Sequence, residues 1–365
     1  MILGIDVSTY LEELAHGAVY LDGEIPMDPL DAFVANGVDW MRIRVWNDPK
    51  SPAGEPYLAG NNDIDTYIRL ATLAKRKGFS LLMDFHYSDF WADPGKQMIP
   101  KAWQGYDISQ MTEAVYEFTK ACLEKAREAG VAPQMIQVGN EITNGMLWPV
   151  GKLEQPDGTR GNYDHFCRLV DAGCRACREV LPQARIVLHL ERSNDQEVYQ
   201  EFFTRMQEAG IDYDIIGASY YPYWHGTPDE LFANLNRCRR FGKEIMIMEL
   251  GYGFTTKAYS LGGQESRLVI DSDRAFVPGL TERYPMTPGG QAEYIRFILA
   301  RAREEGIGGV FYWEPLWIPG DGICWASEAG QAYIHEEGKS TSNEWANQCL
   351  FDYEGKKLPA FDVFT

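Results

Sequence analysis

The sequence predicts an α/β fold of one domain: a single (β/α)8 TIM barrel over residues 1–365, with long loops after its strands. Eight short apolar runs of strand character recur along the chain, and helical patterns lie between them. Connections from helix to strand are short, whereas those from strand to helix are long and rich in polar and aromatic residues. We therefore expect the functional site on the face where the strands end.

The eight predicted strands are mostly apolar, as parallel strands buried on both faces should be. In chain order they are Leu3–Val7, Trp40–Val45, Ser80–Phe85, Met135–Gly139, Arg185–His189, Ile215–Ser219, Ile245–Glu249 and Gly309–Trp313.

Apolar residues at three- and four-residue spacing predict helices between these strands, in patterns that start at Ile64, Val115, Phe166 and Tyr294. A glycine stands before six of the strands, where a residue in the left-handed conformation would close the preceding helix. These glycines are Gly37, Gly78, Gly130, Gly210, Gly242 and Gly306.

The composition limits the partners of the chain. Its formal net charge is −19, which disfavours nucleic acids and anionic membrane surfaces because both are polyanions. No stretch approaches the ~18 apolar residues that a membrane span needs. We expect a monomer that binds neither a membrane nor nucleic acid and uses no cofactor.

Two features bear on the compartment. Met1–Ser8 leads directly into the first predicted strand, without the basic and apolar regions of an export signal. Seven cysteines are an odd number, which disfavours a disulfide framework. We therefore expect a cytoplasmic protein, or a secreted one if a leader has been trimmed. Cys174 and Cys177 form a C-x-x-C, but with Cys167 they follow helical spacing and indicate a buried helix face rather than a zinc site.

Two predicted strands deliver a glutamate at their C-terminal ends, in the runs MIQVGNE and EIMIMEL. The glutamates are Glu141 and Glu249, on the fourth and seventh strands. Burying a carboxylate is costly unless it is paired or used, and two carboxylates that face each other across a pocket can hydrolyse a glycosidic bond. Glu141 would keep a proton as the acid/base, and Glu249 would be the ionised nucleophile.

Further polar residues at the strand ends are predicted to bind substrate or support this pair. Arg44 would stabilise the charge of Glu249 and hold it in line. Tyr221 would donate a hydrogen bond to the same carboxylate. Asn140 suits a sugar hydroxyl, and His86 suits a hydroxyl or the neighbours of the acid/base.

Aromatic residues are abundant, with 10 Trp and 20 Tyr among 365 residues. Sugars present apolar C–H faces that pack on such rings. Trp313, at the end of the eighth strand, would form the floor under a sugar ring. Trp91 and several other tryptophans lie in the long loops, where a glycan cleft would explain their presence.

Several long motifs resemble those of glycoside hydrolase family 53, the arabinogalactan endo-β-1,4-galactanases. The resemblance covers nearly the whole chain and implies a retaining clan-A barrel that cleaves β-1,4-galactan. By position it makes Glu141 the acid/base and Glu249 the nucleophile, and it supports the other binding residues named above. The motifs are RIRVWNDP (42–49), GNND (60–63), LLMDFHYSDFWADPGKQ (81–97), VGNEITNGMLWP (138–149), ASYYPYWHG (218–226) and FYWEPLWIP (311–319).

The resemblance also raises the question of a calcium site, because bacterial members of the family often carry one between the loops after strands seven and eight. Here those loops offer only Asp271 and Asp273 at suggestive spacing, and Ala346 stands where an acidic ligand is expected. Calcium takes 6–8 oxygen ligands. We therefore predict no calcium site of this type and no other metal.

Three alternatives stay open on the sequence. Another clan-A specificity, such as a β-galactosidase, mannanase or glucanase, would use the same catalytic pair. A non-catalytic glycan-binding barrel would keep the tryptophans and lose a carboxylate, yet both glutamates are present. A metal-dependent barrel hydrolase would need clustered histidines, and the six histidines include no H-x-H pair.

Overall fold

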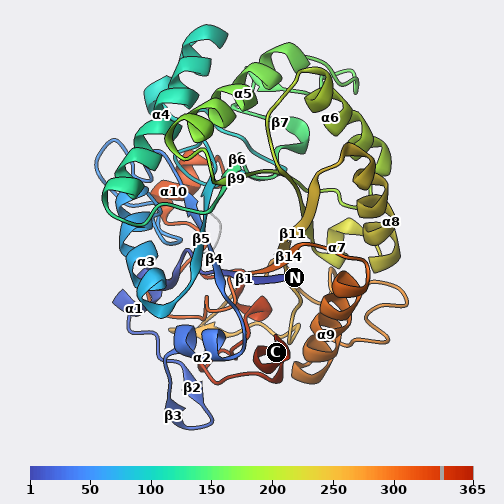
Figure 1. Cartoon of the computed structure of the whole chain (residues 1–365). Coiled ribbons are helices and arrows are strands. Elements are labelled where there is room, and N and C mark those ends of the chain that lie inside the picture. The colour runs from blue at the N-terminus through green and yellow to red at the C-terminus, as the bar shows by residue number, and fades with distance from the viewer. Residues whose placement is uncertain (338–340, 365) are drawn as a thin grey trace.

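The computed structural model describes residues 1–337 and 341–364. Eight parallel strands form a closed barrel in the order β1-β14-β11-β10-β9-β6-β5-β4, and helices surround it (Figure 1). The predicted (β/α)8 barrel is therefore confirmed. The barrel strands are β1 (Ile2–Asp6), β4 (Trp40–Val45), β5 (Ser80–Phe85), β6 (Met135–Val138), β9 (Arg185–Leu190), β10 (Ile215–Tyr220), β11 (Glu244–Leu250) and β14 (Gly309–Trp313).

Each predicted strand overlaps one observed strand, with small shifts at the ends. Glu249 lies within β11, whereas Glu141 lies three residues beyond the end of β6. Neighbouring strands pack closely in the barrel. A side chain at Gly4 of β1 would meet the Phe311 ring of β14 at 2.3 Å, so only glycine fits there.

The four predicted helical patterns lie in α3 (Ile64–Lys77), α4 (Ile108–Glu128), α5 (Tyr163–Val180) and α9 (Pro288–Glu304). Three barrel helices had no such prediction, namely α2 (Pro29–Ala35), α6 (Gln196–Glu208) and α8 (Pro228–Cys238). Each of these begins at a side-chain cap, from Asp28, Asp195 and Thr227 respectively. All six glycines that were predicted to close helices have positive φ angles.

The eighth helix of the barrel is replaced by a short 3-10 turn, η5 (Pro359–Val363), which packs beside α9. Phe361 of this turn lies against Phe33 of α2, with ring centroids 4.3 Å apart. The end of the chain therefore closes the ring of helices between α9 and α2.

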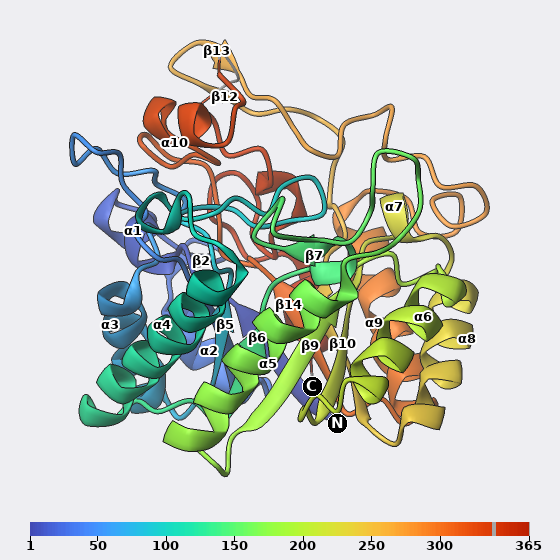
Figure 2. The same cartoon turned by 90° about the horizontal axis from the view of Figure 1, so that it is seen from above.

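The long loops gather at one end of the barrel, opposite the two termini (Figure 2). They carry short elements that lie outside the wall of the barrel. These are α1 (Tyr10–Ala15), β2 (Leu21–Asp22), β3 (Ile25–Pro26), η1 (Lys101–Trp103), η2 (Ile142–Asn144), β7 (Gly145–Met146), β8 (Gly151–Lys152), α7 (Pro222–His225), β12 (Ser260–Leu261), β13 (Gln264–Glu265), α10 (Glu328–Tyr333) and η4 (Ala346–Gln348); η3 (Arg239–Phe241) extends α8.

The main apolar core lies between the strands and the helices, and a smaller cluster that includes Leu82, Met246 and Phe311 fills the barrel interior. Cys174 and Cys177 are buried in α5, which confirms their reading as a helix face. Among the described residues, no helix is both long and apolar enough to cross a membrane.

Candidate active site

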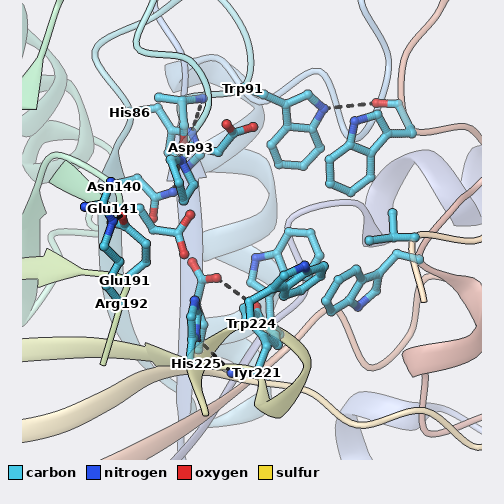
Figure 3. A pocket seen from close by; sticks show the side chains of 17 residues that line it. His86, Trp91, Asp93, Asn140, Glu141, Glu191, Arg192, Tyr221, Trp224 and His225 are labelled. Carbon is cyan, nitrogen blue, oxygen red and sulfur yellow. Dashed lines mark hydrogen bonds and ion pairs between the residues drawn. The ribbon is translucent and has the colours of Figure 1, made fainter. Parts of the chain in front are cut away.

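A pocket of about 430 Å³ opens at the end of the barrel where the strands finish, and it contains both glutamates (Figure 3). It holds seven of the eight residues predicted for the site, all except Arg44. Its lining consists of His86, Trp91, Ala92, Asp93, Pro94, Asn140, Glu141, Glu191, Arg192, Tyr221, Trp224, His225, Glu249, Val269, Trp313, Trp325 and Trp345.

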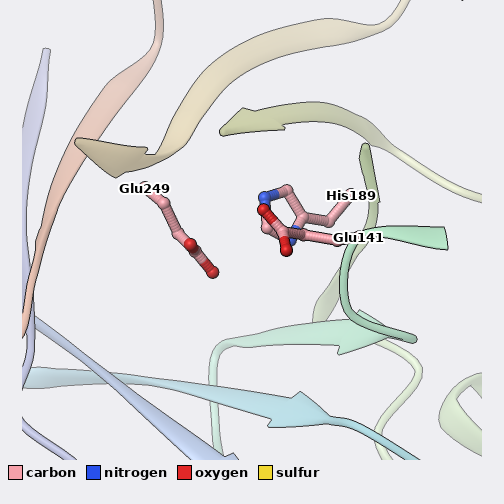
Figure 4. Close-up of side chains that lie close together, drawn as sticks. All are labelled: Glu141, His189 and Glu249. Carbon is pink, nitrogen blue, oxygen red and sulfur yellow. The ribbon is translucent and has the colours of Figure 1, made fainter. Parts of the chain in front are cut away.

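Glu141 and Glu249 approach each other from opposite walls (Figure 4). One oxygen of each carboxylate and one nitrogen of His189 all lie within 4.8 Å of one another. Glu141 reaches this position because its backbone turns sharply after β6, with φ at 49° in the left-handed region. Glu249 arrives by a register shift in the pairing of β11 with β10.

Glu249 is surrounded by groups that favour its charged form. Arg42 Nη2 lies 2.9 Å from Oε1, and the Tyr221 hydroxyl donates to Oε2 at 2.8 Å. Burial, with a further contribution from the charges of Asp84 and Asp6, raises the pKa of Glu249 to about 7 even though Arg42 and Tyr221 lower it. The predicted hydrogen bond from Tyr221 is therefore present.

Glu141 lies in the opposite environment. Burial, followed by the negative charges of Glu249 and Glu191, raises its pKa well above the usual range of a glutamate. Its described hydrogen-bond donor is the hydroxyl of Ser219, 2.6 Å from Oε1. A proton shared by the two glutamates therefore resides on Glu141, because only Glu249 has a guanidinium beside it.

The arginine that contacts Glu249 is Arg42, not Arg44 as the sequence analysis predicted. Arg42 also pairs with Asp6 and Asp84, each at 2.8 Å, so it is fixed at the base of the pocket. Both arginines lie on β4 two residues apart and therefore share a face of the strand. Arg44 instead pairs with Glu314 at 2.6 Å, and its carbon Cζ lies 4.5 Å from the ring centroid of Trp91.

His86 and Asn140 line the pocket but are already engaged by protein groups. Trp46 Nε1 and the Ala92 amide donate to His86 Nδ1 at 3.3 and 3.2 Å, while Nε2 lies 3.1 Å from Asp84. Asn140 donates to the Ala92 carbonyl at 2.9 Å, and its oxygen accepts from Arg42 at 2.9 Å. Direct contact of His86 nitrogens with a hydroxyl would require one of these bonds to break.

Tryptophan rings form much of the remaining wall. Trp313 meets Trp345 edge to face, with centroids 4.6 Å apart at 88°. Trp91 stacks on Trp325 at 4.6 Å and 16°, and its Nε1 donates to the Trp325 carbonyl at 3.0 Å. These contacts fix the rings before any ligand arrives, so an apolar surface is preorganised beside the two carboxylates.

A family model described as glycosyl hydrolase family 53 matches residues 2–364. The chain belongs to glycoside hydrolase family 53. This family 53 chain is 34% identical to the endo-β-1,4-galactanase of Bacillus subtilis (strain 168), over 90% of this chain and 76% of that protein. It is therefore a glycoside hydrolase.

Solved structures agree with this assignment. The family 53 catalytic domain of Ignisphaera aggregans superposes with a TM-score of 0.87 at 36% identity, covering 100% of this chain and 95% of that one. A structure from a study of two fungal β-1,4-galactanases gives a TM-score of 0.77 at 27% identity, covering 100% and 98%.

Several residues of the site of this family 53 enzyme were given no role from the sequence, although His189 was identified at the end of its strand. Ser219 and His189 form a chain with Glu141, because the Ser219 oxygen lies 2.9 Å from His189 Nε2. Gln137 donates to Asp84 at 2.5 Å from within β6. A buried glutamine in the apolar run MIQV was the available signal for this network.

By distance alone, Glu141, His189 and Glu249 would suit a metal ion. The chemistry disagrees, because both ring nitrogens of His189 have polar partners in Ser219, Gln137 and Asn140. Burial and the nearby Arg42 charge lower the pKa of His189 well below its usual value, so the ring is neutral. His189 therefore orients the carboxylate network rather than offering a free ligand.

The loops where the family resemblance raised a calcium site, after β11 and β14, are joined by protein groups. Asn347 Nδ2 donates to the carbonyl oxygens of Thr255 and Ile270 at 2.8 and 2.7 Å, so an amide ties the two loops together. Asp271 accepts from the backbone N–H groups of Asp273 and Arg274, both at 3.1 Å. An amide and a single carboxylate oxygen engaged by backbone N–H groups are a poor match for an ion that takes 6–8 oxygen ligands.

Proposed function

We propose that this enzyme hydrolyses β-1,4-galactosidic bonds in galactan or derived galacto-oligosaccharides with retention of configuration. The observation that carries the proposal is the close approach of two carboxylates with opposite electrostatic surroundings, Glu141 and Glu249. Retaining enzymes need their carboxyl groups ~5–5.5 Å apart, whereas inverting enzymes leave room for a water at ~6.5–9.5 Å. The 4.8 Å limit between their nearest oxygens supports retention.

The substrate proposal is supported by the relatives, whose names describe endo-β-1,4-galactanases. It is also supported by the rings of Trp313 and Trp91 beside the carboxylates. In this proposal the sugar packs on the Trp313 face, while Asn140, His86 and Tyr221 line its polar edge. Arg44 lies behind Trp91 and supports that ring instead of touching the sugar.

The first chemical step would form a covalent glycosyl-enzyme. Glu249 attacks the anomeric carbon as the bond to the leaving oxygen breaks, and Glu141 transfers its proton to that oxygen. The Arg42 cation and the Tyr221 hydroxyl keep Glu249 ionised before the attack. Ser219 holds the Glu141 carboxyl group in position.

The second step would release the sugar. Glu141, now a carboxylate, takes a proton from a water molecule that attacks the same carbon, and Glu249 departs as a carboxylate. Loss of charge on Glu249 in the intermediate lowers the pKa of Glu141, since Glu249 is one of the charges that raise it. The two residues thus alternate in their preferred protonation states.

The test is a substrate panel of galactan, mannan and glucan, with product lengths resolved and the first-formed anomer followed by NMR. We expect cleavage of galactan with the β-anomer appearing first. Preferential cleavage of mannan or glucan would reject the substrate assignment and leave another clan-A specificity. Initial release of the α-anomer would reject the retaining mechanism.

A further inference from the structure

The two ends of the pocket differ in chemistry. Figure 3 shows Glu191 and Arg192 beside Glu141, on the side away from Trp91. Glu191 follows β9 directly, is only 2% exposed, and lines the pocket. One end of the pocket is therefore built from aromatic rings and the other from a carboxylate and a guanidinium.

Glu191 is buried without the hydrogen bonds that a carboxylate normally requires. Within the described part of the chain, neither of its carboxylate oxygens accepts a hydrogen bond of standard distance and angle. Burial raises the pKa of this carboxyl group to about 7, although the nearby Thr143 and Arg192 lower it. The nearest cation is Arg192, whose Nε lies 3.4 Å from Oε1 but is not aligned to donate. Leaving a buried carboxylate unbonded costs free energy, and such groups in folded proteins call for a functional explanation.

Arg192 is held in place by a contact outside the pocket. Its Nη1 lies 2.8 Å from Oε1 of Glu154, in the loop after β6. Its backbone adopts a left-handed conformation with φ at 52°. Residues other than glycine rarely adopt this conformation, and they keep it where the surrounding structure enforces it. The guanidinium is thus fixed at the rim of the pocket, next to the carboxylate of Glu191.

The positions of the two catalytic glutamates define which sugar lies at which end. Tyr221 bonds Glu249 at 2.8 Å, and its ring contacts Trp345 with centroids 5.3 Å apart. The nucleophile therefore belongs to the aromatic end, where the sugar that it attacks would pack. The leaving sugar extends past Glu141 toward the other end, because Glu141 protonates the oxygen between the two sugars.

We propose that Glu191, positioned by Arg192, accepts hydrogen bonds from hydroxyl groups of the leaving sugar. In its ionised form this carboxylate only accepts hydrogen bonds, and its two oxygens match two neighbouring hydroxyl donors on a pyranose ring. Binding a hydroxylated leaving group satisfies the unbonded oxygens, whereas an aromatic leaving group leaves them unsatisfied. Glu191 is thus a specificity determinant for a sugar at this end of the pocket, an assignment that rests on the catalytic roles proposed above.

The test compares two substrates that share the attacked sugar and differ in the leaving group. A β-1,4-galactotetraose releases a sugar, and 4-nitrophenyl β-1,4-galactobioside releases a phenol. For Glu191→Gln we expect kcat/KM on the tetraose to fall by about 10-fold or more, since bonds to charged groups are the stronger ones. We expect a change of less than about 3-fold on the aryl substrate, where no hydroxyl reaches position 191.

Two further variants make the result interpretable. Arg192→Gln changes a partly exposed side chain and should give a smaller loss in the same direction, even if the first variant folds poorly. Glu208→Gln is the same chemical exchange on α6, at a side chain 59% exposed, and should leave both substrates unaffected. Thermal unfolding of each protein checks that the fold is intact.

The outcomes separate this proposal from the catalytic one. Equal loss on both substrates, or no loss on either, rejects the role of Glu191 while leaving the catalytic assignment standing. A shift of the pH profile to lower pH without selective loss also rejects it, and reduces Glu191 to an electrostatic neighbour of Glu141, because loss of its negative charge lowers the pKa of Glu141. If the unaltered enzyme cleaves the aryl substrate but no galactose oligomer, both proposals fail.

Discussion

Glu141 and Glu314 share the same backbone conformation after a strand, but their side chains have different surroundings. Each follows a barrel strand, β6 or β14, with its backbone in the left-handed region at φ of 49° and 48°, and the two strands lie on opposite sides of the barrel. Glu314 is enclosed by Arg44 at 2.6 Å and Thr9 at 2.8 Å. Glu141 has Ser219 on one side and the pocket on the other. A buried glutamate at a strand end is therefore a sign of function only where a cavity reaches it.

The surroundings of Glu314 extend this contrast. Thr9 also bonds Glu13, and Tyr20 donates to the same carboxylate. Burial raises the pKa of Glu13 well above its usual range, as it does for Glu141. Raised pKa values alone therefore do not separate the proposed catalytic carboxylates from structural ones, because burial produces them in both places.

The largest expected effect is the loss of activity on substituting a glutamate that lines the pocket. Glu249→Ala should lower kcat on galactan by about 10⁴-fold or more, because it removes the group that forms the intermediate. Its unfolding free energy should fall less than in the Glu314→Ala variant, because Arg42 keeps Asp6 and Asp84 as partners when Glu249 is removed. Steady-state kinetics and urea unfolding measure the two quantities, and near-normal turnover would rule out Glu249 as the nucleophile.

Substitution of Glu314, the enclosed glutamate, should lower stability rather than activity. Glu314→Ala leaves Arg44 buried without its closest partner, and breaking such a pair costs about 3–5 kcal/mol of unfolding free energy. We expect kcat of the folded fraction to change much less than stability does. Urea unfolding at pH 7 tests this, with Glu141→Ala as the matched exchange. If Glu314→Ala were as stable as Glu141→Ala, the two sites would not differ as described.

A smaller effect is expected on the ionisation of Glu249. The Tyr221 hydrogen bond lowers the pKa of Glu249, so Tyr221→Phe should raise that pKa and protonate the nucleophile at higher pH. The acidic limb of kcat/KM should move upward by roughly 0.5–1 pH unit, the equivalent of one hydrogen bond. A pH–rate profile measures the shift. An unchanged acidic limb would separate Tyr221 from the ionisation of Glu249.

The smallest expected effect is the response to calcium. Asn347, in the loop after β14, already joins the loop after β11 at Thr255 and Ile270, so an ion adds no new connection between the two loops. We expect the melting temperature to be the same in calcium and in a chelator, since only a ligand that binds the folded state stabilises it. A clear rise in calcium would show that the loops hold the ion after all.

The sequence predicted the barrel well because its signals are local. Each strand is a short apolar run, and glycines such as Gly78, with φ at 98°, end the helices as expected. The helices α6 and α8 were not predicted, although the caps Asp195 and Thr227 mark their first turns. For these two helices the capping residues are the stronger local signal of a helix start.

The site was predicted less completely because its contacts join distant strands. Arg42 and Arg44 share one face of β4, and the sequence does not tell which of them reaches Glu249. That choice depends on the tilt of the strands and on the position of Glu314 across the barrel. The unbonded state of Glu191 likewise depends on groups around it, which no local pattern encodes.

The aromatic wall has one practical consequence. Five of the ten tryptophans of the chain line the pocket: Trp91, Trp224, Trp313, Trp325 and Trp345. Half of the indole rings of the protein therefore lie within reach of a bound oligosaccharide. Filling the pocket would change the polarity around these fluorophores, so saccharide affinity is measurable by quenching or spectral shift without any attached label.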